Sequence, residues 1–162
     1  FTRKQVVHTR RKVEVMNTMQ LATVTATLCL LSWAHAAETA GKSTLDNLQA
    51  AFAGESNAQS KYTAFAVKAD EEGYKSVAAL FRATAMSEGI HAKKHAAAIK
   101  KLGAEAQAVI AKADVKSTKE NLEAALAGET HEKDSMYPEF IKVATAEKNK
   151  QAVRSFQGAM AA

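Results

Sequence analysis

The sequence has 162 residues, of which 47% are hydrophobic and 24% are charged, a composition typical of one globular domain and unlike a disordered or collagen-like chain. Aromatic residues make up only 6% of it and there is one proline, which disfavours an all-β fold because strands are rich in β-branched and aromatic residues. The single cysteine, Cys29, excludes an intrachain disulfide and a zinc or iron–sulfur site built from cysteines of this sequence.

The net charge of +5 is concentrated near the start of the sequence. Residues 1–36 contain five of the 22 Lys and Arg residues and one of the 17 Asp and Glu residues, so the other 126 residues carry 17 basic against 16 acidic side chains. A nucleic-acid-binding protein needs its basic surface on the folded body. The sequence therefore predicts no nucleic-acid partner.

Residues 1–36 have the pattern of an export signal. Five basic residues precede an uncharged apolar run at 21–33, and Ala34 and Ala36 supply small residues for signal peptidase. The run is shorter than the roughly 20 residues that span a bilayer as a helix, although an uncleaved anchor or a buried helix is the alternative. We expect cleavage near Ala36 and a periplasmic or secreted protein, or a cytoplasmic one if the leader is not real. Translation from Met16 or Met19 would make residues 1–15 upstream read-through.

The body, residues 37–162, is predicted to be all-α. Apolar residues at helical spacing indicate a first helix over about 44–72 and a second over about 74–102, each followed by a glycine that ends it. Residues 104–117 form a connection in which one or two helical turns are expected at 106–113.

A third helix is expected from about residue 118 to 146, with a kink or a new section at Pro138, and a fourth begins near residue 148. Long helices with short breaks favour an antiparallel, ferritin-like four-helix bundle.

An internal repeat divides this bundle into two helical hairpins. Residues 44–55 read TLDNLQAAFAGE and residues 118–129 read TKENLEAALAGE, with eight of twelve positions identical. We therefore expect two hairpins of common origin, related by a pseudo-twofold axis.

Both copies of the repeat end in a glutamate on the apolar face of the helix. Glu55 lies seven residues after Leu48, and Glu129 lies seven after Leu122 and three after Leu126. Burying a lone carboxylate is costly, so two inward glutamates at equivalent positions indicate a shared ligand in the bundle centre. The alternative is that both are surface residues.

The second helix adds Glu88 and His91, which lie three apart on one face. One Glu from each of two helices, with Glu-x-x-His from the other two, is the ligand set of carboxylate-bridged di-iron and di-manganese bundles. Phe81 and Phe156 align at an offset of 75. The second Glu-x-x-His would then fall at positions 163 and 166, beyond the given sequence.

Residues 43–162 resemble the rubrerythrin family, ferritin-like non-haem di-iron peroxidases, through AFAGESNAQSKYTAFA, FRATAMSEGIHAKKH and LAGETHEKDSMYPEF. The resemblance implies two iron ions, with manganese as an alternative. The family's ligands match Glu55, Glu88, His91, Glu129 and an additional carboxylate, Glu132. In the family, a histidine and a carboxylate exchange on one iron as the cluster is reduced, which implies a catalytic role for His91 and Glu132.

Tyr62 and Tyr137 match two family tyrosines that hydrogen-bond the ligand carboxylates, the alternative being ordinary core tyrosines. His95 is expected to be a solvated histidine rather than a group that supports the ligands.

The resemblance also implies hydrogen peroxide as substrate, oxidative-stress defence as the role, a rubredoxin-like external electron donor and a homodimer. Many family members carry a C-terminal rubredoxin domain with paired CxxC motifs, which this sequence does not contain, and many are cytoplasmic. Two other functions stay open. One is an iron-binding or ferroxidase module, and the other is a metal-free exported bundle.

Overall fold

The computed structural model describes residues 42–161, and these residues are all-α, as predicted. The leader and its cleavage site lie outside the described residues. The helices are α2 (Thr44–Glu71), α3 (Lys75–Lys101), α4 (Thr118–His131), a π-helical segment (Glu132–Met136), α5 (Tyr137–Ala146) and α6 (Lys150–Met160). None of these helices is long and apolar enough to cross a membrane.

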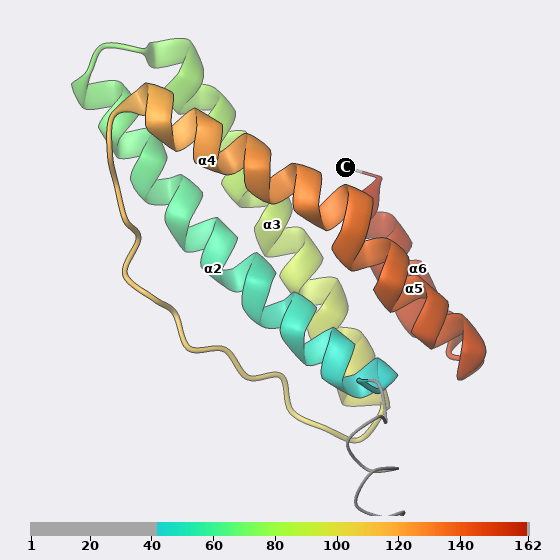
Figure 1. Cartoon of the computed structure of the whole chain (residues 1–162). Coiled ribbons are helices and arrows are strands. Elements are labelled where there is room, and N and C mark those ends of the chain that lie inside the picture. Colours follow the sequence, from blue (N-terminus) through green and yellow to red (C-terminus); the bar gives the residue numbers. More distant parts are fainter. Residues whose placement is uncertain (1–41, 162) are drawn as a thin grey trace, which may run out of the picture. The chain divides into compact units, whose positions relative to one another are not determined.

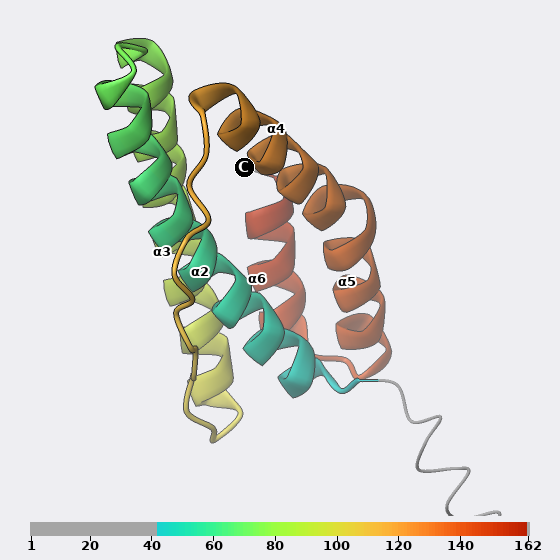
Figure 2. The ribbon, with the colours of Figure 1, turned by 60° about the vertical axis from the view of Figure 1, so that its left-hand side comes forward.

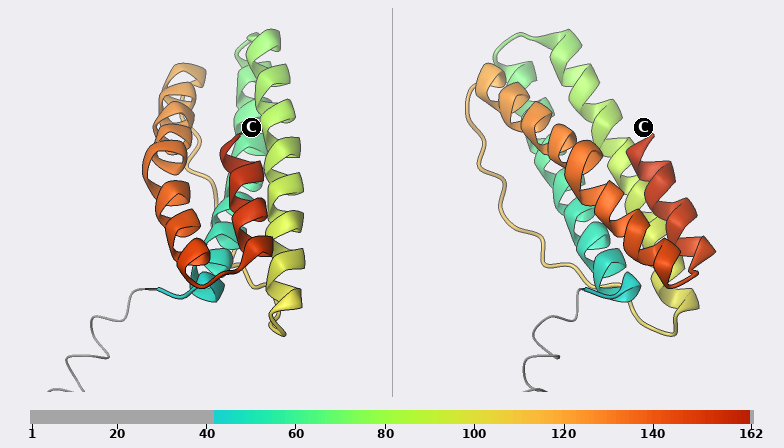
Figure 3. Two further views of the ribbon diagram at one scale, coloured as in Figure 1. Left: turned by 90° about the vertical axis from the view of Figure 1, so that its right-hand side faces the viewer. Right: turned by 45° about the vertical axis from the view of Figure 1, so that its right-hand side comes forward.

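The helices form four rods, because α4, the π-helical segment and α5 run on as one continuous helix (Figure 1). Helices α2 and α3 pair as one hairpin. The continuous rod and α6 form the other, and α6 also packs against α3 (Figures 2 and 3). The predicted four-helix bundle of two hairpins is therefore confirmed.

Serine caps begin the first helix of each hairpin. Ser43 and Asp46 form a capping box at α2, and Ser117 and Glu120 form one at α4. In each box the serine side chain accepts a hydrogen bond from the backbone N–H of the acidic residue, and the acidic side chain accepts one from the backbone N–H of the serine. The repeat thus specifies where both hairpins start.

The connection between α3 and α4 contains no helix, so the predicted turns at 106–113 are wrong. The segment runs back along α2 (Figure 1), where amide side chains bind its backbone. Gln49 donates to the Glu105 carbonyl at 2.7 Å, and Asn57 accepts from the Ala111 N–H at 2.8 Å. These bonds satisfy backbone groups that a local helical turn would otherwise pair.

The π-helical segment explains an irregularity in the repeat. Glu55 and Glu129 lie 74 residues apart, whereas Tyr62 and Tyr137 lie 75 apart. The N–H of Tyr137 bonds to the carbonyl of Glu132, five residues back, and a π-helical turn accommodates one extra residue. Pro138 lies just after this segment and has no N–H to donate to an α-helical turn. The kink or new section predicted at Pro138 is therefore observed as a π-helical segment that ends just before it.

Two aromatic clusters lie at equivalent places in the two hairpins. Tyr62 packs with Phe65 and Phe81, with ring centroids 5.4–6.1 Å apart. The residues 75 positions later, Tyr137, Phe140 and Phe156, pack together at 5.5–6.3 Å. The candidate site lies between the two tyrosines.

Candidate metal centre

Three buried side chains from α2 and α3 form the centre of the site. Glu55 is 1% exposed, and Glu88 and His91 are also buried. Nδ1 of His91 lies 3.2 Å from Oε2 of Glu88 and 3.7 Å from Oε1 of Glu55. One ligand atom from each of the three residues lies within 4.8 Å of the others, a spacing that lets one cation contact all three.

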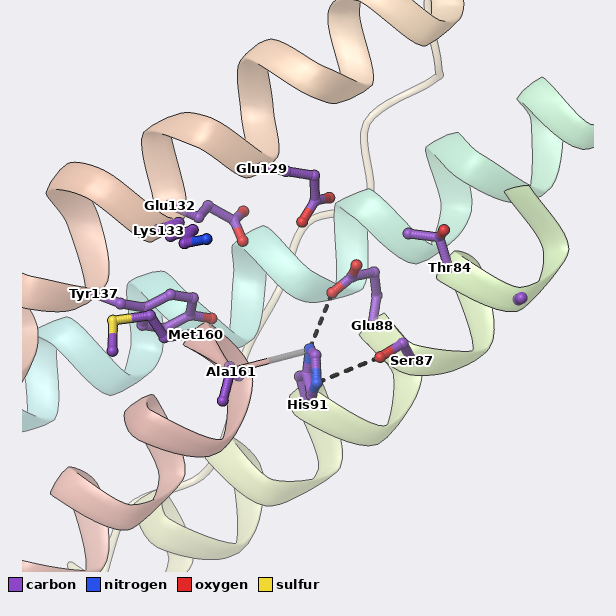
Figure 4. A pocket seen from close by; sticks show the side chains of 12 residues that line it. Thr84, Ser87, Glu88, His91, Glu129, Glu132, Lys133, Tyr137, Met160 and Ala161 are labelled. Atoms are coloured by element: carbon purple, nitrogen blue, oxygen red, sulfur yellow. Dashed lines mark hydrogen bonds and ion pairs between the residues drawn. The ribbon is translucent and has the colours of Figure 1, made fainter. Parts of the chain in front are cut away.

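Two further carboxylates reach toward this group from the opposite hairpin. Glu129 at the end of α4 and Glu132 in the π-helical segment point toward Glu88 and His91 (Figure 4). They line a pocket of about 670 Å³ between α3, this rod and the end of α6. Ser87 also lines it, with Oγ 3.4 Å from Nε2 of His91.

The predicted inward face of α4 is only partly correct. Glu132 is half-buried, but Glu129 is exposed and Leu126 is 69% exposed. The pocket beside Glu129 opens to solvent. Glu129 is therefore exposed to water, although it has the same helical spacing as the buried Glu55.

The two tyrosines bridge the hairpins in a crossed arrangement. Tyr62 on α2 donates its hydroxyl to Oε1 of Glu129 at 2.6 Å. Tyr137 on α5 donates to Oε1 of Glu55. Each carboxylate is therefore oriented by a buried tyrosine of the other hairpin, as the pseudo-twofold relation requires.

Burial and mutual repulsion change the proton affinity of the cluster. Burial, with Glu55 nearby, raises the pKa of Glu88 to about 8, and burial beside the other carboxylates raises the pKa of Glu132 to about 7. The nearby carboxylates of Glu55 and Glu88 raise the pKa of His91 to about 9. Burial alone would raise the pKa of Glu55, but polar contacts with His91 and His95 hold it well below its ordinary range.

The residues fit a bound metal. Oε2 of Glu55 is buried and has no hydrogen-bond partner among residues 42–161, which is costly for a carboxylate oxygen unless a cation satisfies it. Carboxylate oxygens and imidazole suit iron or manganese. Bound cations would take the place of the protons that the cluster holds near neutral pH.

We expect the metal-free protein to lose stability as the pH rises. Glu88 and His91 have ordinary pKa values of 4.5 and 6.5 and folded values of about 8 and about 9, so the folded state binds more protons than the unfolded state between these limits. Its free energy of unfolding therefore falls between about pH 4.5 and pH 9. One pKa unit on one group corresponds to about 1.4 kcal/mol.

Urea unfolding of chelator-treated protein at pH 6 and pH 9 measures this difference. Glu88→Gln should reduce it, because the glutamine does not titrate. A midpoint that is equal or higher at pH 9 would contradict the electrostatics described above.

The prediction that His95 is solvated is wrong, since its side chain is 0% exposed. Nδ1 lies 2.8 Å from Oγ of Ser155, and Nε2 lies 3.2 Å from Oη of Tyr137. The available signal was its spacing, four residues after His91 and seven after Glu88, which places it on the ligand face. Nothing in the sequence marked Ser155.

The family model for rubrerythrin matches residues 46–162. Nigerythrin of Nitratidesulfovibrio vulgaris is 44% identical over 121 residues, which cover 74% of this chain and 59% of that protein. A rubrerythrin of Porphyromonas gingivalis is 40% identical over 117 residues, covering 72% and 58%. This chain spans about three-fifths of the length of these relatives.

Among solved structures, fully reduced, all-ferrous nigerythrin superposes with a TM-score of 0.67 at 44% identity, over 73% of this chain and 59% of that chain. A partially reduced state of nigerythrin gives a TM-score of 0.66 at the same identity. These similarities cover the helical body in which the buried Glu and His residues lie.

Proposed function

The chain belongs to the rubrerythrin family, and on that premise we propose that it is a di-iron peroxidase that reduces hydrogen peroxide to water. The observation that carries the proposal is the buried group of Glu55, Glu88 and His91, with an unsatisfied carboxylate oxygen on Glu55. Similarity to an all-ferrous nigerythrin structure supports iron as the metal.

Five side chains are the proposed metal ligands within the described residues: Glu55, Glu88, His91, Glu129 and Glu132. Two ferrous ions, when bound, supply the two electrons that cleave the O–O bond of a peroxide. The four carboxylates offset the charge of two divalent cations. Tyr62 and Tyr137 hold two of these carboxylates in place from the opposite hairpin.

We assign His91 and Glu132 the catalytic role, as two residues that would hold one of the iron ions. Both line the same pocket, which is open enough to admit a small oxidant. Glu132 is half-buried, and burial beside the other carboxylates raises its pKa to about 7 in the metal-free protein. An external reductant such as a rubredoxin-like protein is the proposed electron source, because each peroxide consumes two electrons. A homodimer is the proposed assembly.

Turnover tests this function directly. Iron-loaded protein with excess reductant should consume many peroxide molecules per chain, measured by loss of peroxide under anaerobic conditions. Iron oxidation that stops at the amount of bound iron would instead identify an iron-binding or ferroxidase module. Absence of bound iron would favour a metal-free bundle.

Export is a separate proposal, supported by the basic, apolar and small-residue pattern of residues 1–36. A bacterium expressing the chain with this leader should yield mature protein beginning at Ala37, as read by intact-mass spectrometry of the periplasmic fraction. Ala34→Phe should block cleavage, because signal peptidase favours small residues there. Uncleaved protein that stays in the cytoplasm would contradict the proposal.

A further inference from the structure

We propose that His95 is a positioning residue of the metal centre. It fixes the hydroxyl of Tyr137, which orients Glu55, and it is itself held by Ser155 of α6. The proposal rests on the proposed function, because it concerns the geometry of a metal ligand. His95 touches none of the reacting groups.

The contacts form a continuous buried chain from α6 to the ligand. Ser155 and His95 are joined at 2.8 Å, and His95 and Tyr137 at 3.2 Å. Tyr137 then donates to Glu55. Nε2 of His95 is 3.7 Å from Oε1 of Glu55, too far for a direct hydrogen bond, so His95 acts on Glu55 through the tyrosine.

The direction of each hydrogen bond follows from the last one. Tyr137 donates its hydroxyl hydrogen to Oε1 of Glu55, whose carboxylate oxygens accept. The oxygen of Tyr137 then accepts from Nε2–H of His95. In the neutral imidazole Nδ1 is left to accept the hydroxyl of Ser155. Each contact thus has one donor and one acceptor, which fixes the tautomer of His95 and the rotation of both hydroxyls.

Loss of His95 would change the orientation of Glu55, because Tyr137 binds only one of its two carboxylate oxygens. Tyr137 binds Oε1, and Oε2 remains buried without a hydrogen-bond partner in the part of the chain that the structure describes. If Tyr137 lost its donor, its hydroxyl could rotate and Glu55 could turn. Oε2 would then no longer be held toward a metal. Outer groups that orient a ligand typically change metal affinity about 10–100-fold when they are removed.

The equivalent tyrosine, Tyr62, has other neighbours within the described residues. Tyr62 binds Glu129, but its aromatic neighbours are Phe65 and Phe81, and Glu129 is exposed. In contrast, the ring of His95 packs on Tyr137 and Phe156 at 6.0 and 5.6 Å, and Glu55 is buried. The histidine therefore contacts the tyrosine whose carboxylate partner is buried.

The test compares His95→Leu with His95→Gln in the full chain. Leucine fills the buried space but donates nothing, whereas the glutamine amide can still donate to Tyr137. Co(II) serves as the probe, because its visible absorption reports the geometry of its ligands and a titration gives its affinity. Urea unfolding of the metal-free variants measures folding separately. The control is His131→Leu at an exposed histidine of α4.

We expect His95→Leu to weaken Co(II) binding about 10–100-fold and to change the absorption spectrum, with His95→Gln restoring most of both. Metal-free His95→Leu should still unfold cooperatively. If Co(II) affinity and spectrum are unchanged in His95→Leu while only the urea midpoint moves, the residue is merely structural and the proposal is wrong.

Failure of the proposed function has a different signature. A wild-type chain that binds Co(II) normally but turns over no peroxide would overturn the peroxidase and leave the positioning result standing. A wild-type chain that binds no Co(II) would overturn both.

Discussion

Glu55→Gln is expected to weaken metal binding by at least about 100-fold while leaving the bundle folded, because a ligand substitution should cost more than loss of a supporting contact. The glutamine keeps an oxygen that accepts from Tyr137 but loses the charge of the buried carboxylate. It also replaces one carboxylate oxygen of Glu55 with an amide nitrogen that cannot bind a cation beside Glu88 and His91. Titration with Co(II) or anaerobic Fe(II) measures the loss.

Glu123→Gln is the matched control, because Glu123 is exposed on α4 and pairs only with Lys119 at 3.8 Å within the described residues. Its metal affinity should equal that of the unaltered chain. If Glu55→Gln bound metal as tightly as this control, the buried group would not be the metal centre, and the peroxidase proposal would lose its main support.

The fold could be predicted because its determinants are local. Helical spacing, two serine caps and two terminating glycines are all visible in the sequence, and Gly73 and Gly103 adopt φ values of 83° and 78°. The segment 106–113 could not be predicted in this way. Its conformation depends on amide side chains of α2, such as Asn57, which lie more than 50 residues away in the sequence.

In the candidate site, too, the features set within one helix could be predicted, and those set by contacts between helices could not. Glu55, Glu88 and His91 were foreseen because each lies on the apolar face of its own helix. The exposure of Glu129 was not, because it depends on what lies across the pocket. The link from His95 to Ser155 joins residues 60 apart on different hairpins, and no spacing within either helix encodes it.

Phe156→Ala is expected to destabilise the metal-free protein by about 3–5 kcal/mol, the usual cost of deleting a buried aromatic side chain. Phe156 is 0% exposed and packs on His95, Tyr137 and Phe140, with centroid distances of 5.5–6.0 Å. Small domains have only about 5–15 kcal/mol of stability in total. Urea unfolding, followed by circular dichroism, should therefore show a large fall in midpoint.

Leu126→Ala is the control for Phe156→Ala, because a leucine that is 69% exposed should cost within about 0.5 kcal/mol on truncation. Phe156 also supports the residues that orient Glu55, so the alanine variant should lose Co(II) affinity even in conditions where it stays folded. Phe156→Leu should retain more of both properties, since it fills most of the cavity. Equal midpoints for Phe156→Ala and Leu126→Ala would mean that α6 does not pack on the site as described, and the route from Ser155 to Glu55 would fail with it.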